Sequence, residues 1–148
     1  MASGAARRLD ALATHVTTRP RTSPVAADSG GSPADVVRTY KQVEGGSLSL
    51  HIFTPPSHKA TDARPAVVFF FGGGWLGGSY TQFVPQSQFF ASRGMVCICA
   101  EYRTESSHGA SPFDCVEDGR SVMRWVRGHA AELGIDPNRL GAVSTMRS

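Results

Sequence analysis

The feature that most constrains the fold is an apolar run at residues 66–71 that leads directly into three consecutive glycines. An unbroken run of β-branched and aromatic residues of this length is typical of a central β-strand that is buried on both faces. Glycines at the carboxyl end of such a strand let the backbone approach a neighbouring group closely and present bare N–H groups. The stretch from Gly72 to Gly74 therefore predicts a main-chain site for an anion or an oxyanion.

Composition argues against several classes of protein. The chain has 148 residues, of which 41% are hydrophobic and 18% are charged, as expected for one globular domain. A net charge of +3, with arginines near the amino terminus that have almost no aromatic neighbours, does not predict nucleic-acid binding. No stretch approaches the roughly 18 apolar residues of a membrane span. No secretory signal peptide is recognisable, so the cytoplasm is the default expectation.

The cysteines do not have the pattern of a metal site or a disulfide framework. Cys97 and Cys99 alternate on one face of an apolar strand, and Cys115 stands apart. We expect all of them to be small buried hydrophobic side chains. The sequence predicts neither a metal nor a cofactor.

The first 35 residues differ in composition from the rest of the chain. They consist mainly of Ala, Ser, Thr, Arg, Pro and Gly, with few large apolar side chains. Such a segment buries too little surface to offset its ordering entropy, so residues 1–35 are predicted to be disordered. Its Arg- and Ser-rich composition faintly resembles an organelle transit peptide. Its acidic residues and the lack of an apolar face argue against that interpretation. The folded domain is predicted to span residues 36–148.

Within that domain, strand and helix patterns alternate. Two strand-like runs at 39–44 and 47–53 flank Gly45 and Gly46, which suit a hairpin turn. After the glycine stretch, the patterns predict a helix at 82–92, a strand at 95–100 and a polar loop at 104–110. A long helix that Ser111 caps follows at 112–133, then a turn at 136–138 and a last strand at 140–143. This order predicts an α/β fold with an amino-terminal hairpin, a mostly parallel sheet and flanking helices. Ligands of such sheets bind beyond the carboxyl ends of the strands, where the glycines lie.

Two nucleotide-binding motifs resemble the glycine stretch. A Walker A loop requires a lysine where Gly78 stands, which excludes that motif. Gly72, Gly74 and Gly77 match the dinucleotide fingerprint, and Glu101 ends the next strand. The predicted helix nevertheless begins several residues too late for that motif. A dinucleotide-binding domain stays an alternative.

Several segments together resemble the α/β-hydrolases, in particular the lipase and esterase branch that includes acetyl esterases acting on carbohydrate esters. These segments are TYKQVEGGSLSLHIFTPP, FFFGGGWLGGS, MVCICAEYR and HGASPFDCVEDGRSVMRWVRGHAAELGIDPNRL. The resemblance implies that Gly73 and Gly74 supply oxyanion-hole N–H groups and that the substrate is a carboxylic ester. Phe71 stands where the family commonly has a histidine, so a side-chain brace for the loop is expected to be missing.

The resemblance does not extend to the nucleophile. The family's GxSxG elbow is absent from the chain, and Ser144, which lacks the flanking glycines, is a weak candidate. The family's triad order places the histidine after the serine, but all histidines precede Ser144: His15, His51, His58, His108 and His129. Ser106 with His108 is a local alternative that is better interpreted as solvated polar groups.

These observations predict a truncated α/β-hydrolase domain that carries the oxyanion loop without nucleophile, acid or base and is inactive alone. An apolar sheet edge would be left at residues 140–143, which predicts self-association. A non-catalytic fragment that binds a partner through this edge is a further alternative.

Overall fold

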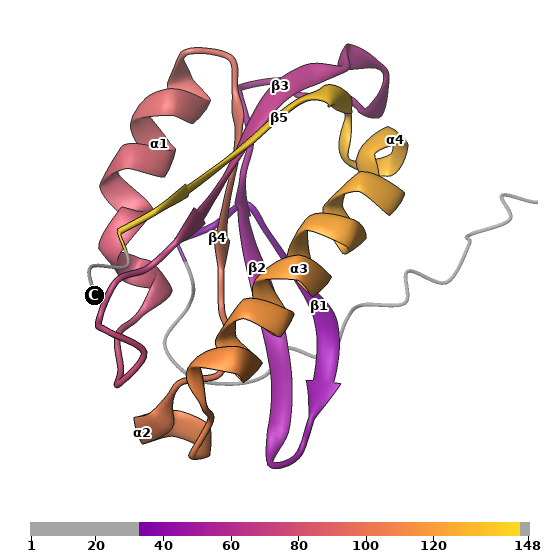
Figure 1. Ribbon diagram of the computed structural model, residues 1–148. Coiled ribbons are helices and arrows are strands. Elements are labelled where there is room, and N and C mark those ends of the chain that lie inside the picture. Colours follow the sequence, from indigo (N-terminus) through magenta and orange to yellow (C-terminus); the bar gives the residue numbers. More distant parts are fainter. Residues whose placement is uncertain (1–32, 146–148) are drawn as a thin grey trace, which may run out of the picture. The chain divides into compact units, whose positions relative to one another are not determined.

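The computed structural model describes residues 33–145 and shows a sheet with helices on both faces (Figure 1). The strands are β1 (Val36–Val43), β2 (Gly46–Phe53), β3 (Arg64–Phe70), β4 (Val96–Ala100) and β5 (Ile135–Ser144). The helices are α1 (Val84–Ser92), α2 (Glu105–His108), α3 (Pro112–Gly128) and α4 (Ala130–Leu133), with 3-10 turns η1 (Ala60–Asp62) and η2 (Tyr80–Phe83). Disorder is predicted for residues 1–35. Of these, residues 1–32 lie outside the described part of the chain, and only residues 33–35 lie within it.

The five-stranded sheet has the order β1-β2-β4-β3-β5. The parallel strands β4, β3 and β5 form the part of the sheet that the alternation of strands and helices predicted. The amino-terminal hairpin joins them through an antiparallel pairing of β2 with β4, so the sheet as a whole is mixed. Gly45 has a φ of +85° at the hairpin turn, a conformation that favours glycine.

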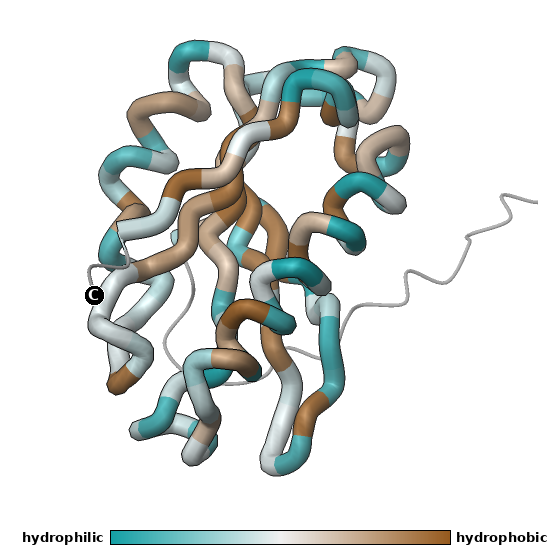
Figure 2. The backbone as a smooth tube through the Cα atoms, viewed as in Figure 1, coloured by the Kyte–Doolittle hydropathy of each residue, from teal (hydrophilic) through white to brown (hydrophobic). Residues whose placement is uncertain are grey.

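Side chains alternate between two cores on opposite faces of the sheet. On one face, Val68 and Ile98 pack with Val122 and Val126 of α3. On the other, Phe69 and the two strand cysteines pack with residues of η2 and α1. The apolar residues are concentrated in the central strands (Figure 2). Burial on both faces explains why β3 is apolar throughout its length.

The structure corrects three of the predicted elements. The segment at 104–110 contains the short helix α2 instead of only a loop, because Thr104 forms a capping box with Ser107. The helix predicted to run to residue 133 is divided, since the backbone of His129 leaves the helical region between α3 and α4. β5 begins earlier than predicted and includes the turn at Asp136, whose carboxylate accepts a hydrogen bond from the N–H of Asn138. Among the described residues, no helix is long and apolar enough to cross a membrane.

Candidate oxyanion site at the glycine loop

The glycine loop, residues 72–79, begins where β3 ends and contains a tight turn. Gly74 and Trp75 have φ values of +59° and +64°, and the N–H of Leu76 donates a 3.1 Å hydrogen bond to the carbonyl of Gly73. Two consecutive positive φ angles closed by such a bond define a type I′ turn. Glycine suits the first of these positions because it has no Cβ to clash with the backbone.

Two further glycines permit close contacts of the backbone with itself. A Cβ atom on Gly73 would lie 1.8 Å from the carbonyl oxygen of Gly77, and its φ is +149°. A Cβ atom on Gly78 would lie 2.6 Å from the carbonyl oxygen of Gly72, with a φ of +136°. The compact shape of the loop therefore requires glycine at both positions.

Neighbouring segments hold the loop on two sides. The N–H of Gly72 donates a 2.7 Å hydrogen bond to Oε1 of Gln82 in η2. On the other side, the N–H groups of Glu105 and Ser106 donate to the carbonyls of Trp75 and Leu76, at 3.0 and 2.9 Å. The first turn of α2 thus satisfies carbonyl groups of the loop and fixes the turn in place.

Phe71 braces the start of the loop, contrary to the prediction that a brace is missing. Its side chain is buried, and its ring stacks on the ring of Tyr102 with centroids 4.2 Å apart. The Tyr102 hydroxyl also donates a 2.5 Å hydrogen bond to the carbonyl of Phe71. An aromatic stack and a buried hydrogen bond therefore occupy the place where the family commonly has a histidine.

The N–H groups of Gly73 and Gly74 are available to a ligand. Within residues 33–145, neither N–H has a hydrogen-bond acceptor, and Gly73 is exposed to solvent. Backbone N–H groups held on a fixed turn without a protein acceptor are suited to bind a negatively charged oxygen. The geometry is compatible with the predicted role of both glycines, which stays a prediction.

The end of β5 lies beside the start of the glycine loop. Ser144 pairs with Phe70 across the sheet, and a Cβ atom on Gly72 would lie 2.6 Å from Oγ1 of Thr145. The chain therefore passes next to the candidate oxyanion site where it leaves the sheet. Ser144 stays a weak candidate nucleophile.

The histidines of the described residues have ordinary structural partners. His108 contacts Ser107 through a 2.7 Å hydrogen bond at Nδ1, and no bond joins it to Ser106. Ser107 in turn belongs to the capping box of α2, in which Thr104 is the N-cap, so the Ser106 and His108 alternative is not supported as a catalytic pair. His58 contacts the carbonyl of Leu133 at 2.8 Å, and His15 lies outside the described residues.

The dinucleotide alternative is not favoured. Glu101, its candidate ribose ligand, is bound within the protein, where its carboxylate lies 2.7 Å from Nε2 of His51. No α-helix opens inside the glycine motif, because η2 begins at Tyr80 and α1 begins at Val84. A dinucleotide fingerprint instead places its pyrophosphate at the N-terminus of the helix that follows the motif directly.

The cysteines are buried free thiols, as predicted. Burial raises the pKa of the Cys97 thiol to about 12, so this side chain stays a neutral, unreactive thiol near pH 7. Within residues 33–145, no group of His, Cys, Asp or Glu side chains has a metal-binding arrangement.

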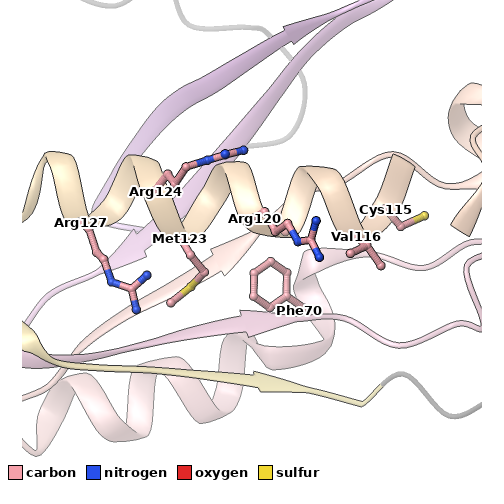
Figure 3. A pocket seen from close by; sticks show the side chains of 8 residues that line it. Phe70, Cys115, Val116, Arg120, Met123, Arg124 and Arg127 are labelled. Carbon is pink, nitrogen blue, oxygen red and sulfur yellow. The ribbon is translucent and has the colours of Figure 1, made fainter. Parts of the chain in front are cut away.

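A hollow, the α3 groove, lies between α3 and the end of β3 and has a volume of about 460 Å³ (Figure 3). Phe70 and Met123 form part of its apolar lining. The guanidinium groups that line it belong to Arg120, Arg124 and Arg127. No ion pair joins any of these arginines to an acidic residue of the described chain.

Comparisons with known proteins agree with the fold. Residues 50–145 match the BD-FAE family. Carboxylesterase NlhH of Mycobacterium tuberculosis is 32% identical over 95 residues, which cover 63% of this chain. The probable isoprenylcysteine α-carbonyl methylesterase ICMEL1 of Arabidopsis thaliana is 31% identical over 91 residues, or 62% of this chain. A solved esterase of Thermogutta terrifontis, Est2, is 50% identical over 76% of this chain, with a TM-score of 0.74.

The matched region is a minor part of each of these proteins. The chain spans 28% of carboxylesterase NlhH, 18% of ICMEL1 and 41% of the Thermogutta esterase. It resembles carboxylic ester hydrolases in sequence and in fold. The chain thus belongs to the BD-FAE family of α/β-hydrolase esterases and lipases and corresponds to the amino-terminal portion of their fold.

Proposed function

We propose that this chain supplies the oxyanion site of a carboxylic ester hydrolase. The observation that carries the proposal is the pair of N–H groups at Gly73 and Gly74, which have no acceptor within residues 33–145 and lie on a braced turn. In ester hydrolysis, a nucleophile attacks the carbonyl carbon and the carbonyl oxygen becomes an oxyanion. One preorganised N–H donor contributes about 3 kcal/mol to the stability of that transition state.

The remaining catalytic groups are not identifiable in the chain. The sequence has no GxSxG motif, so the serine that would form the acyl-enzyme and the histidine that would take its proton have no assigned residues here. The polypeptide of 148 residues is therefore expected to be inactive by itself. In the complete hydrolase fold, the amide after the nucleophile would be a third donor to the oxyanion.

For the substrate, we propose short-chain carboxylic esters, including acetyl esters of carbohydrates. Two structures of the Thermogutta esterase contain propionate or butyrate, and this esterase is 50% identical to the chain. Small acyl groups are in keeping with those carboxylates. The preference for a carbohydrate alcohol rests on the resemblance to acetyl esterases alone.

We also propose that the 148-residue polypeptide associates with itself through β5. This strand lies at one end of the sheet order, and its residues 141–144 are exposed, including Val143 at 41%. An exposed strand edge with apolar side chains readily pairs with a second strand.

A chimera tests the ester hydrolase proposal. Residues 33–145 replace the matching segment of the Thermogutta esterase, and hydrolysis of p-nitrophenyl acetate and butyrate is measured. We expect turnover by the chimera, a loss of about 100-fold or more in kcat after Gly73→Val, and no turnover by the 148-residue polypeptide. A folded chimera without turnover would contradict the proposal. Turnover by the polypeptide alone that Ser144→Ala abolishes would instead assign the nucleophile to Ser144.

A further inference from the structure

His51 lies in an unusual setting in the middle of β2. Its side chain is buried, and its Nε2 lies 2.7 Å from Oε1 of Glu101, the residue that follows β4. Its ring is also parallel to the ring of Tyr80, with an angle of 3° between the planes and centroids 3.5 Å apart. One side chain therefore joins the hairpin, the end of β4 and the start of η2.

The hairpin fixes the carboxylate that holds His51. Oε2 of Glu101 accepts a 3.2 Å hydrogen bond from the N–H of Ser49. The main chain of Glu101 is also held, since its N–H donates to the carbonyl of Ser49 and its carbonyl accepts a 2.7 Å bond from the Tyr40 hydroxyl. With both its backbone and its carboxylate fixed, Glu101 determines the orientation of the His51 ring, as carboxylates do for many functional histidines.

Tyr80 transmits this orientation to the glycine loop. It is the residue directly after the loop and the first residue of η2. Gln82, in the same turn of η2, accepts the hydrogen bond from the N–H of Gly72 at the other end of the loop. The position of η2 thus sets both ends of the loop, and the His51 ring lies flat against the first side chain of η2.

The surrounding core shows that packing alone does not require these polar groups. Phe53, Cys97 and Cys99 lie on the same face of the sheet as His51 and form an apolar cluster with Phe69. An apolar side chain at position 51 would fill the space without the cost of burying an imidazole and part of a carboxylate. What an apolar side chain would not supply is a fixed ring orientation, which a hydrogen bond to a charged partner provides.

We propose that His51 and Glu101 are positioning residues for the glycine loop. They hold Tyr80 and η2, and through them the N–H groups of Gly73 and Gly74, in the geometry that binds an oxyanion. The functional meaning of this positioning rests on the proposed ester hydrolase function. The positioning itself is a property of the 148-residue chain and can be measured without any turnover.

Tryptophan fluorescence provides the measurement. The chain has two tryptophans, and Trp75 lies within the glycine loop, while Trp125 lies on α3. In a Trp125→Phe background, collisional quenching by acrylamide reports how open the loop is around Trp75. His51→Gln keeps a hydrogen-bonding group for Glu101 but removes the ring, Tyr80→Leu removes the stacking partner, and Tyr80→Phe preserves it.

His58→Gln is the matched control. His58 is also a histidine with a 2.8 Å hydrogen bond at Nε2, but its partner, the carbonyl of Leu133, lies near the start of β3, away from the glycine loop. All variants are compared well below their unfolding transitions, which are measured separately by urea. This separates local opening of the loop from general loss of stability.

We expect the quenching constant of Trp75 to rise by about twofold in His51→Gln and in Tyr80→Leu, with little change in Tyr80→Phe or His58→Gln. An unchanged quenching constant in both His51→Gln and Tyr80→Leu would overturn the proposal. An equal rise in His58→Gln would overturn it as well, because the effect would then be general. In the esterase chimera, His51→Gln should lower kcat with little change in KM. The expected quenching changes in the 148-residue chain, together with a chimera that has no turnover, would leave the positioning in place and contradict only the ester hydrolase function.

Discussion

The rings of Phe71 and Tyr102 are stacked at 4.2 Å, and the Tyr102 hydroxyl donates its hydrogen bond to the carbonyl of Phe71 itself. Tyr102 follows β4, and Phe71 follows β3, so the pair joins the carboxyl ends of two parallel strands. The glycine loop begins at the next residue after Phe71. This pair therefore anchors the start of the glycine loop to the core of the sheet.

Removing the hydroxyl of Tyr102 should destabilise the fold. Tyr102→Phe leaves the buried carbonyl of Phe71 without its donor, for which we expect a loss of about 1 to 2 kcal/mol in the free energy of unfolding. Tyr102→Leu also removes the aromatic pair and should cost about 1 kcal/mol more. Urea denaturation followed by circular dichroism measures both variants. Equal stability of the Tyr102→Phe variant and the wild type would show that the hydroxyl contributes nothing.

Tyr102 should also make stability depend on alkaline pH. Burial, with a smaller contribution from Cys115, raises the pKa of Tyr102 to about 12, against an ordinary value of 10.0. The folded state then binds the phenolic proton more tightly than the unfolded state, so this contribution is complete below pH 10 and is lost as the pH rises towards 12. Unfolding free energies measured across this range should fall with pH. The unfolding free energy of Tyr102→Phe should fall less steeply with pH. Part of the fall should remain in this variant, because burial also raises the pKa of Tyr40.

Asp118 of α3 is the centre of a buried ion network and should be sensitive to substitution. Its fully buried carboxylate accepts from Lys41 at 2.7 Å and from the guanidinium of Arg103 at 2.8 and 2.9 Å. Asp118→Ala leaves both cations without this partner, for which we expect a cost of about 3 to 5 kcal/mol. Urea denaturation at pH 7 measures this cost. The matched control is Asp136→Asn, which removes a more exposed pair with Arg139 and should have little effect.

The same carboxylate should make stability depend on acidic pH. Desolvation acts to raise the pKa of Asp118, but the hydrogen bonds from Arg103 and Lys41 outweigh it, and the pKa is lowered from 3.8. The contribution of the ion network is therefore present above about pH 4 and is lost as the pH falls through the folded-state pKa. Unfolding measured between pH 7 and pH 2 should show a steeper loss for the wild type than for Asp118→Asn. Parallel curves would contradict a stabilising role of the charge.

The two candidate oxyanion glycines should respond differently to alanine. A Cβ at position 73 meets the carbonyl of Gly77, so Gly73→Ala must displace the loop. A Cβ at position 74 has no neighbour within 4 Å, and Gly74→Ala should cost only the left-handed backbone strain of about 1 kcal/mol. Trp75 emission should change in Gly73→Ala and stay close to wild type in Gly74→Ala. Emission that shifts equally in both variants would show that the loop has a different conformation.

Self-association through β5 should weaken when its exposed apolar side chain becomes charged. Val143→Lys places a like charge on each associating strand and should shift the monomer fraction upwards by severalfold in sedimentation experiments. Raising the salt concentration should partly restore association of the variant, since it screens that repulsion. Phe113→Lys, at an exposed apolar residue of α3, is the control and should leave the monomer fraction unchanged. A wild-type chain that stays monomeric at all concentrations would end this proposal.

Local sequence patterns were sufficient to predict most elements of the fold. The run at 66–71 predicted β3 because a strand buried on both faces admits only apolar residues, and Ser111 with Pro112 predicted the start of α3. The alternation of strands and helices predicted the parallel part of the sheet. Two of the predictions that failed depended on local conformation, since a capping box at Thr104 forms α2 and the backbone of His129 divides the long helix. The missing brace depended on a contact between distant residues, because Phe71 is a brace only where Tyr102 lies beside it.

The glycine loop also has features that the sequence predicted and features that only the tertiary structure decided. Its glycines by themselves predicted a main-chain site, because only glycine tolerates the close approach of one backbone segment to another. The sequence could not show which N–H groups of the loop have an acceptor, since that depends on where Gln82 places its side-chain oxygen. It also could not show which carbonyls of the loop are bound by N–H groups of α2. Nor could it assign Glu101 to His51, because residues 50 positions apart meet only after β2 and β4 have paired. Short-range chemistry was thus determined by the sequence alone, whereas the partners of each polar group were decided by tertiary structure, which alone brings distant segments within hydrogen-bond distance.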